Sequence, residues 1–151
     1  VKENEATMRN DRTVYLKDYR QTDFIIESVD LIFELGEVLT TVGSQIRMKR
    51  RPGVSPDAPL EFVGDGLQLA GLALDGKPLL PARYECTSDH LTINDLPADD
   101  AFTLTIKTNI NPTANTQLLG LYRTNGVYST QCEAEGFRRV TYFYDRPDVL
   151  T

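Results

Sequence analysis

The chain has 151 residues, of which 40% are hydrophobic and 25% are charged, and its formal net charge is −6. These values predict one globular domain that is long enough to bury its own core. The sequence also excludes a membrane-spanning helix, since no apolar run approaches the roughly 20 residues that such a helix needs. Nucleic-acid binding is not expected either, because the basic residues gather only in a short cluster between Arg47 and Arg51.

The first 14 residues are polar and lack the apolar segment of a signal peptide, so we expect a polar arm at 1–14 and a β domain over 15–151. Within that domain, apolar residues first alternate with period two over residues 28–49, which predicts a long hairpin. The side chains expected on one face of this hairpin are Val29, Leu31, Phe33 and Leu35 from the first strand, and Val38, Thr40, Val42, Ser44, Ile46 and Met48 from the second.

Turn signals divide the next part of the chain into short strands. Residues 51–59 hold three prolines and one glycine, so this stretch is predicted to be a loop. Pairs of residues that suit tight turns follow at intervals, and they predict further hairpins. These pairs are Asp75-Gly76, Ser88-Asp89 and Asn125-Gly126.

The segment FTLTIKTNI alternates cleanly and is predicted to be a strand, with Phe102, Leu104, Ile106 and Thr108 facing inward. No segment offers a helical stripe of ten residues or more, and short helical turns are expected only in the arm and within 137–148. The fold class predicted from the pattern is therefore all-β, a sandwich or a large bent sheet built from antiparallel hairpins.

Two cysteines and one histidine limit the chemistry of the chain. Cys86 and Cys132 lie far apart and make no disulfide framework, so we expect free thiols in a reducing, cytoplasmic environment. His90 is distant in sequence from Cys132, which argues against a nucleophilic cysteine–histidine pair. The chain contains neither an HExxH nor a CxxC motif, and we expect it to hold no zinc of its own.

The densest group of polar residues is in STQCEAEGFRR, residues 129–139. In an extended segment, Gln131, Glu133 and Glu135 would point the same way, and three acceptors on one face suit a primary ammonium group with its three donors. Burying such acids without a cation would be costly. The stretch is therefore either a cation- or amine-binding site or a polar loop with exposed acids. Gly136 is a candidate for an unusual backbone angle.

Three segments carry a resemblance to a known family: YLKDYRQTDF (15–24), NPTANTQLLGLYRTNG (111–126) and QCEAEGFRRVTYFYDRPDV (131–149). They resemble the N-terminal domain of bacterial aminopeptidase N, a zinc-dependent metallopeptidase of the gluzincin class. The resemblance runs from about Tyr15 to the last residue. It implies a saddle-shaped β domain that is followed in the family by a thermolysin-like catalytic domain with HExxH, and it implies that this chain is an excised domain, inactive alone.

The same resemblance implies roles for individual residues. Gln131 and Glu133 match the pair that binds the free α-amine of the peptide substrate in similar enzymes. For Glu135 the expectation rests on sequence proximity alone: it has a structural or supporting role and lies near Arg138. The implied partners are the catalytic and C-terminal domains of the same chain and the N-terminus of a peptide, and the implied cofactor is zinc, held outside this fragment.

The aromatic run from Tyr142 to Tyr144 is expected to pack against the catalytic domain, and therefore to form an exposed apolar patch in isolation. An alternative hypothesis is a free-standing β-sandwich module that binds a partner protein or a small amine. That hypothesis predicts a well-folded domain without a large apolar patch.

Overall fold

The computed structural model describes residues 15–98 and 101–149, so the predicted arm at 1–14 lies outside the described residues. The described residues form ten strands and three short 3-10 helices, and the all-β prediction is confirmed. None of the helices in this part of the chain is long and apolar enough to cross a membrane. The elements are η1 (Leu16–Asp18), β1 (Phe24–Glu34), β2 (Thr40–Arg50), β3 (Leu60–Val63), β4 (Gln68–Leu74), β5 (Lys77–Pro78), η2 (Pro81–Arg83), β6 (Tyr84–Cys86), β7 (His90–Ile93), β8 (Ala101–Ile110), β9 (Gly120–Thr124), β10 (Val127–Gln131) and η3 (Phe137–Arg139).

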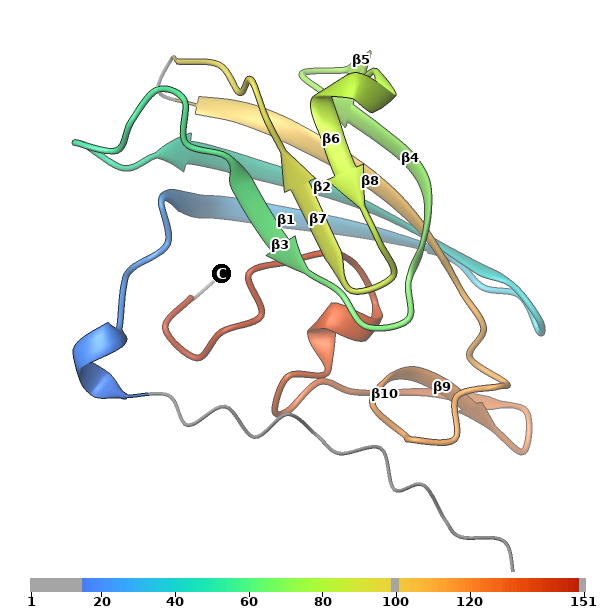
Figure 1. Cartoon of the computed structure of the whole chain (residues 1–151). Helices are drawn as coiled ribbons and strands as arrows, with labels where there is room; N and C mark the ends of the chain where they lie inside the picture. The colour runs from blue at the N-terminus through green and yellow to red at the C-terminus, as the bar shows by residue number, and fades with distance from the viewer. Residues whose placement is uncertain (1–14, 99–100, 150–151) are drawn as a thin grey trace, which may run out of the picture.

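The strands form three antiparallel sheets (Figure 1). The largest has five strands in the order β1-β2-β8-β4-β5, and a three-stranded sheet, β3-β7-β6, packs on it. The hairpin β9-β10 forms a separate two-stranded sheet. Apolar side chains from the two larger sheets share one core, so these sheets pack as the two layers of a sandwich.

The period-two prediction holds for the central strands of the large sheet. The inward-facing side chains of β2 and β8 are all buried, at 2% relative exposure or less. They are Thr40, Val42, Ser44, Ile46, Met48, Phe102, Leu104, Ile106 and Thr108. Alternation alone predicted the buried faces of β2 and β8 correctly. Both strands are central in their sheet and another layer covers their inner face, so every inward-facing side chain is buried.

The inner face of β1 is predicted correctly but is only partly covered. The strand has an irregular register between Ile26 and Ser28, after which Val29 lies opposite Ile46 of β2. Toward the hairpin end the covering layer is missing from the described chain, and Phe33 is 37% exposed. This uncovered end of β1 is the main departure from a closed sandwich.

Two of the predicted hairpin turns have the expected left-handed backbone. Asp75 and Gly76 have φ of 48° and 76°, and Asn125 and Gly126 have φ of 50° and 81°. Positive φ at both central residues gives the twist that joins antiparallel strands through a two-residue loop. These turns therefore link β4 to β5 and β9 to β10 as the sequence predicts.

The prediction of an exposed aromatic patch at 142–144 is wrong. Tyr142, Phe143 and Tyr144 are 0%, 6% and 9% exposed. The backbone of Phe143 pairs with Val63 of β3 through two hydrogen bonds of 3.0 Å, which carries the aromatic run into the core. The ring of Phe62 then contacts that of Tyr144 edge-on, with centroids 4.9 Å apart. The rings are thus part of this domain's own core.

Candidate functional site

The polar segment that follows β10 is a turn and not an extended strand. Gln131 is the last residue of β10, and the chain turns back so that the Gly136 N–H donates to the Cys132 carbonyl at 3.0 Å. The expectation that Gln131, Glu133 and Glu135 share one strand face is therefore wrong, since the strand ends at the first of them. All three side chains are exposed.

Gln131 and Glu133 are nevertheless held close together. The side-chain amide oxygen of Gln131 accepts a hydrogen bond from the backbone N–H of Glu133 at 3.1 Å. A carbonyl oxygen accepts two hydrogen bonds, so one lone pair of this oxygen remains for a further donor. The turn thus places the Gln131 amide oxygen beside the backbone of Glu133, and both side chains are exposed at the surface.

The unusual backbone angle belongs to Glu135 and not to Gly136. Glu135 has φ of 63°, whereas Gly136 has φ of −91°, which any residue can adopt. Gly136 is required for a different reason, since a Cβ at this position would lie 2.6 Å from the Gln131 carbonyl oxygen and 2.7 Å from the Cys132 Cα. The absence of a side chain permits the close approach that folds the turn.

Gly136→Ala is therefore expected to open the turn and to lower the free energy of unfolding by about 1–3 kcal/mol, as overpacking against backbone does. Urea unfolding of the chain measures this loss. Gly43→Ala is the matched control, because a Cβ there meets nothing closer than the Ile32 carbonyl oxygen at 3.9 Å. Equal stability of the two variants would contradict the close approach.

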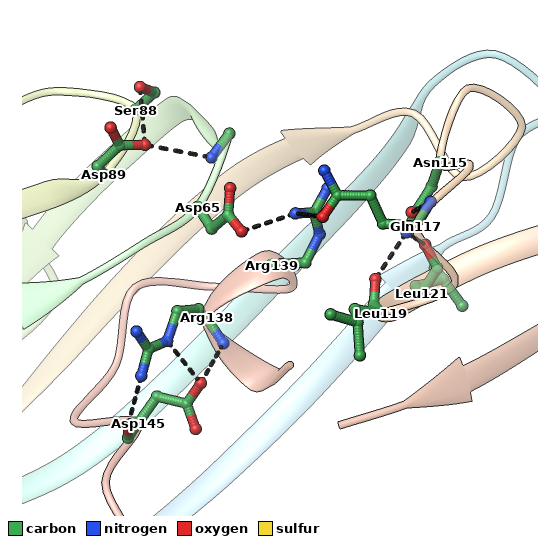
Figure 2. A network of polar contacts seen from close by, with 11 residues as sticks. Asp65, Ser88, Asp89, Asn115, Gln117, Leu119, Leu121, Arg138, Arg139 and Asp145 are labelled. Atoms are coloured by element: carbon green, nitrogen blue, oxygen red, sulfur yellow. Dashed lines mark hydrogen bonds and ion pairs between the residues drawn. The ribbon is translucent and has the colours of Figure 1, made fainter. Parts of the chain in front are cut away.

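Arg138 braces the turn against the segment that follows η3 (Figure 2). Its backbone N–H and its Nε both donate to Asp145 Oδ2 at 3.0 Å, and its Nη2 donates to the Asp145 carbonyl at 2.8 Å. The same Nη2 lies 3.3 Å from Glu135 Oε1. Arg138 thus contacts Glu135, the partner expected for it, while its principal partner, Asp145, was missed.

Arg139 ties the same short helix to two other parts of the chain (Figure 2). Its Nη1 donates to Asp65 Oδ2 at 2.6 Å and to Gln117 Oε1 at 2.9 Å. The segment that carries Gln117 is itself folded by Asn115, whose Nδ2 donates to the Leu119 carbonyl at 2.7 Å. Sequence reasoning assigned no role to these residues, although Asn115 and Gln117 lie in the NPTANTQ segment quoted above.

The DRPDV segment, residues 145–149, is hydrogen-bonded to the start of the described chain. The Tyr19 hydroxyl donates to Asp148 Oδ2 at 2.9 Å, and Arg146 Nη2 donates to the Arg20 carbonyl at 2.7 Å. Burial raises the pKa of the Asp148 carboxyl, but the hydrogen bonds from Tyr19 and Arg146 outweigh it and hold the pKa below its usual value. These polar residues therefore join two distant segments.

Neither a nucleophilic thiol nor a metal centre emerges from the described residues. Burial, followed by the nearby Asp145 carboxylate, raises the pKa of the Cys132 thiol and so reduces its thiolate fraction. His90 is exposed on β7. Within residues 15–98 and 101–149, no three histidine, cysteine or acidic side chains gather into a group that could hold a metal ion. The described residues therefore offer no ligand set for zinc, which the resemblance implies is held outside this fragment.

Solved structures share the fold of this domain. Legionella pneumophila aminopeptidase A in complex with aspartic acid superposes with a TM-score of 0.79 at 31% identity, over 88% of this chain and 16% of that one. An M1 zinc metallopeptidase from Deinococcus radiodurans shares the fold, with a TM-score of 0.67 at 16% identity, over 85% of this chain and 31% of its own. The described residues thus share the fold of a β domain that forms part of these two longer proteins.

Curated sequence relatives match the chain at higher identity. Aminopeptidase N of Caulobacter vibrioides is 44% identical over 146 residues, which are 95% of this chain and 16% of the relative. Aminopeptidase N of Escherichia coli is 43% identical over 136 residues, 90% of this chain and 15% of the relative. No protein-family model matches the chain. The resemblance to the N-terminal domain of bacterial aminopeptidase N is confirmed, and the chain spans about a sixth of the relatives' length.

Proposed function

We propose that this chain is the substrate-anchoring domain of a zinc-dependent aminopeptidase that removes N-terminal amino acids from peptides. The 44% identity to an aminopeptidase N over 95% of the chain supports this assignment. Zinc and the catalytic machinery belong to the catalytic and C-terminal domains of the longer protein, and the fragment alone is inactive. We place the enzyme in the cytoplasm, in keeping with the two free cysteines, Cys86 and Cys132.

The proposal assigns amine binding to Gln131 and Glu133. An N-terminal ammonium offers three donors, which the Glu133 carboxylate and the free lone pair of the Gln131 amide oxygen can accept. The observation that carries this assignment is the difference between the two glutamates of the turn. Within the described part of the chain, Glu135 is ion-paired with Arg138, whereas Glu133 makes no ion pair and is available to a cation.

Neither residue breaks a bond in this proposal. Each holds the substrate's amine at a fixed place, so that the first peptide bond lies at the catalytic centre of the neighbouring domain. Orientation of this kind lowers the barrier by removing freedom of motion before the reaction begins. Zinc in that domain supplies the Lewis acid that polarises the scissile carbonyl or activates water.

The full-length protein is expected to hydrolyse amino-acid arylamides and to leave the N-acetylated arylamides intact, because acetylation removes the ammonium that the anchor binds. Chelation of zinc should abolish the activity, and added zinc should restore it. Continuous absorbance assays of the released arylamine measure both effects. Hydrolysis of both substrates at equal rates would contradict amine anchoring, and activity that survives chelation would contradict the zinc enzyme.

The alternative, a free-standing interaction module, predicts a domain without a large apolar patch. Exposed apolar residues at the end of the β1–β2 hairpin weigh against it: Ile32, Leu35, Val38 and Leu39 are 70%, 54%, 72% and 54% exposed. The coding sequence beyond the codon for Thr151 separates the two hypotheses. A frame that continues into HExxH and a later glutamate supports the enzyme, and a stop codon there supports the module.

A further inference from the structure

Asp145 begins the DRPDV segment, and its carboxylate faces Arg138 of η3 (Figure 2). Its Oδ2 accepts hydrogen bonds from the backbone N–H and the Nε of Arg138, both at 3.0 Å, and its backbone carbonyl accepts one from Arg138 Nη2 at 2.8 Å. The side chains of Asp145 and Arg138 are only 14% and 23% exposed. Ion pairs that are partly shielded from water are screened less than exposed ones. Asp145 is therefore the principal partner of Arg138.

The other acid that Arg138 contacts is a weaker partner. Glu135 Oε1 lies 3.3 Å from Arg138 Nη2, and the Glu135 side chain is 66% exposed. Exposed ion pairs of this kind contribute little to stability. Glu133, two residues earlier in the turn, is exposed and makes no ion pair within the described part of the chain. The guanidinium of Arg138 is thus held by Asp145, in a position from which it reaches Glu135 but not Glu133.

Without the charge of Asp145, Arg138 could pair with Glu133 instead. Glu133 lies five positions before Arg138, and the turn between them folds the chain back on itself. A guanidinium has five N–H donors, enough to hold Glu133 and Glu135 together. It also suits a carboxylate better than a neutral donor does, since its charge and its planar fork strengthen the hydrogen bonds. A released Arg138 would therefore compete with the ammonium of the substrate.

We propose that Asp145 is a positioning residue for amine binding: it holds the guanidinium of Arg138 against η3 and so keeps Glu133 free for the ammonium of the substrate. This inference rests on the proposed function and extends it to a residue that does not touch the substrate. The competing interpretation is that Asp145 and Arg138 brace the fold and have no influence on the charge that Glu133 offers.

Asp145→Asn in the full-length protein is expected to raise KM for amino-acid arylamides about tenfold and to leave kcat within about twofold, because an apparent affinity falls with the fraction of molecules that can bind. A rise of about tenfold corresponds to capture of Glu133 by Arg138 in about nine molecules in ten. Saturating substrate displaces the guanidinium, so kcat is retained. Steady-state kinetics measures both constants, and KM does not depend on how much of the protein is folded. An unchanged KM, or a loss confined to kcat, would overturn the proposal.

Asp148→Asn is the matched control, since it makes the same chemical change three residues further along the segment. It removes the charge that pairs with Arg146 at 2.9 Å, and Arg146 keeps its hydrogen bond to the Arg20 carbonyl. We expect this variant to have the KM of the wild type. A rise in KM similar to that of Asp145→Asn would mean that any loosening of the segment weakens binding, and the specific role of Asp145 would be lost.

Removal of the competing cation separates capture from bracing. Arg138→Gln added to Asp145→Asn is expected to lower KM again relative to Asp145→Asn alone, since no guanidinium remains to pair with Glu133. The backbone N–H at position 138 can still donate to the side-chain oxygen of the introduced asparagine, and Arg139 still ties η3 to Asp65 at 2.6 Å. A brace predicts the opposite result, a KM that stays raised or rises further.

Two single substitutions of Arg138 test the same idea without a change at Asp145, and they keep the test available if Asp145→Asn does not fold. Arg138→Lys keeps a cation but loses the fork that Asp145 holds, so its ammonium can pair with Glu133. Arg138→Gln has no cation. KM should be higher for the lysine variant than for the glutamine variant. Equal values, or a higher KM for the glutamine variant, would favour the brace and overturn the proposal.

Glu133→Gln separates this inference from the proposed function. In a Glu133→Gln background, Asp145→Asn should raise KM no further, because the carboxylate that Arg138 would capture is gone. Wild-type kinetics of Glu133→Gln alone would refute the amine anchor itself. If Glu133→Gln weakens binding but Asp145→Asn raises KM by the same factor in both backgrounds, the anchor stands and the positioning role of Asp145 is overturned.

Discussion

Glu133→Gln in the full-length protein is expected to lower kcat/KM for amino-acid arylamides by about 10- to 100-fold, with a raised KM. The substitution keeps the shape of the side chain but replaces a charge-assisted hydrogen bond to the substrate's ammonium with a neutral one. A hydrogen bond to a charged group contributes about 1.5–3 kcal/mol, which corresponds to this range. Steady-state kinetics over a range of arylamide concentrations separates the effects on kcat and KM.

Glu135→Gln is the matched control, since it makes the same chemical change two residues along the same turn. Glu135 is already paired with Arg138, at 3.3 Å from its Nη2, so its charge is partly neutralised within the domain. We expect the kinetic effect of this variant to be clearly smaller than that of Glu133→Gln. A near wild-type kcat/KM for Glu133→Gln, or an equal loss in both variants, would refute the specific role of Glu133.

Tyr142→Ala is expected to destabilise the chain by about 3–5 kcal/mol, the range typical of removing a large buried aromatic side chain. Tyr142 is fully buried, and its hydroxyl donates to the Thr87 carbonyl at 2.6 Å. Burial, with the hydrogen bond to Cys86 as the next cause, raises the pKa of Tyr142, so the phenol stays protonated and remains a donor. Urea unfolding measures the free-energy change.

Tyr142→Phe separates the packing of the ring from its hydrogen bond. This variant keeps the ring against Gly64 and loses only the hydroxyl, so we expect a loss of about 1 kcal/mol. If Tyr142→Ala cost no more than Tyr142→Phe, the ring would not be part of the core. That result would favour the expectation from the sequence, in which the aromatic run is exposed.

Features of the fold that depend only on residues adjacent in the sequence could be predicted from it. Alternation within β2 and β8 identified their buried faces, because the sidedness of a strand is a property of consecutive residues. The turn at Asn125-Gly126 was predicted for the same reason, since these residue types tolerate positive φ. The resemblance of three segments added the family and the position of the candidate site.

Burial could not be predicted where it depends on contacts between distant parts of the chain. Phe143 is buried because it pairs with Val63, eighty residues earlier, and no local pattern indicates this bridge. Phe33 has the alternation of a core residue but lacks a covering layer among the described elements. Period two reports which side of a strand a residue faces, but not whether another layer lies there.

In the candidate site, too, contacts between residues close in sequence could be predicted and contacts between distant residues could not. Spacing suggested that Gln131, Glu133 and Glu135 share a face, but β10 ends at Gln131 and the two glutamates belong to a turn. Arg138 was expected near Glu135 because the two are three residues apart, and the ion pair is present. The partners of Arg139 come from separate segments, and no sequence spacing relates them.

The two arginines of η3 would also affect which peptide bond the proposed enzyme cleaves. Arg138 and Arg139 tie η3, which follows the turn, to Asp145 and Asp65, and this would limit any shift of the proposed amine-binding groups along a bound peptide. Successive residues of an extended peptide are only about 3.3 Å apart. An anchor that moved by this distance would bring the second peptide bond to the metal and release dipeptides. An anchor held in place in this way would restrict the products to single amino acids.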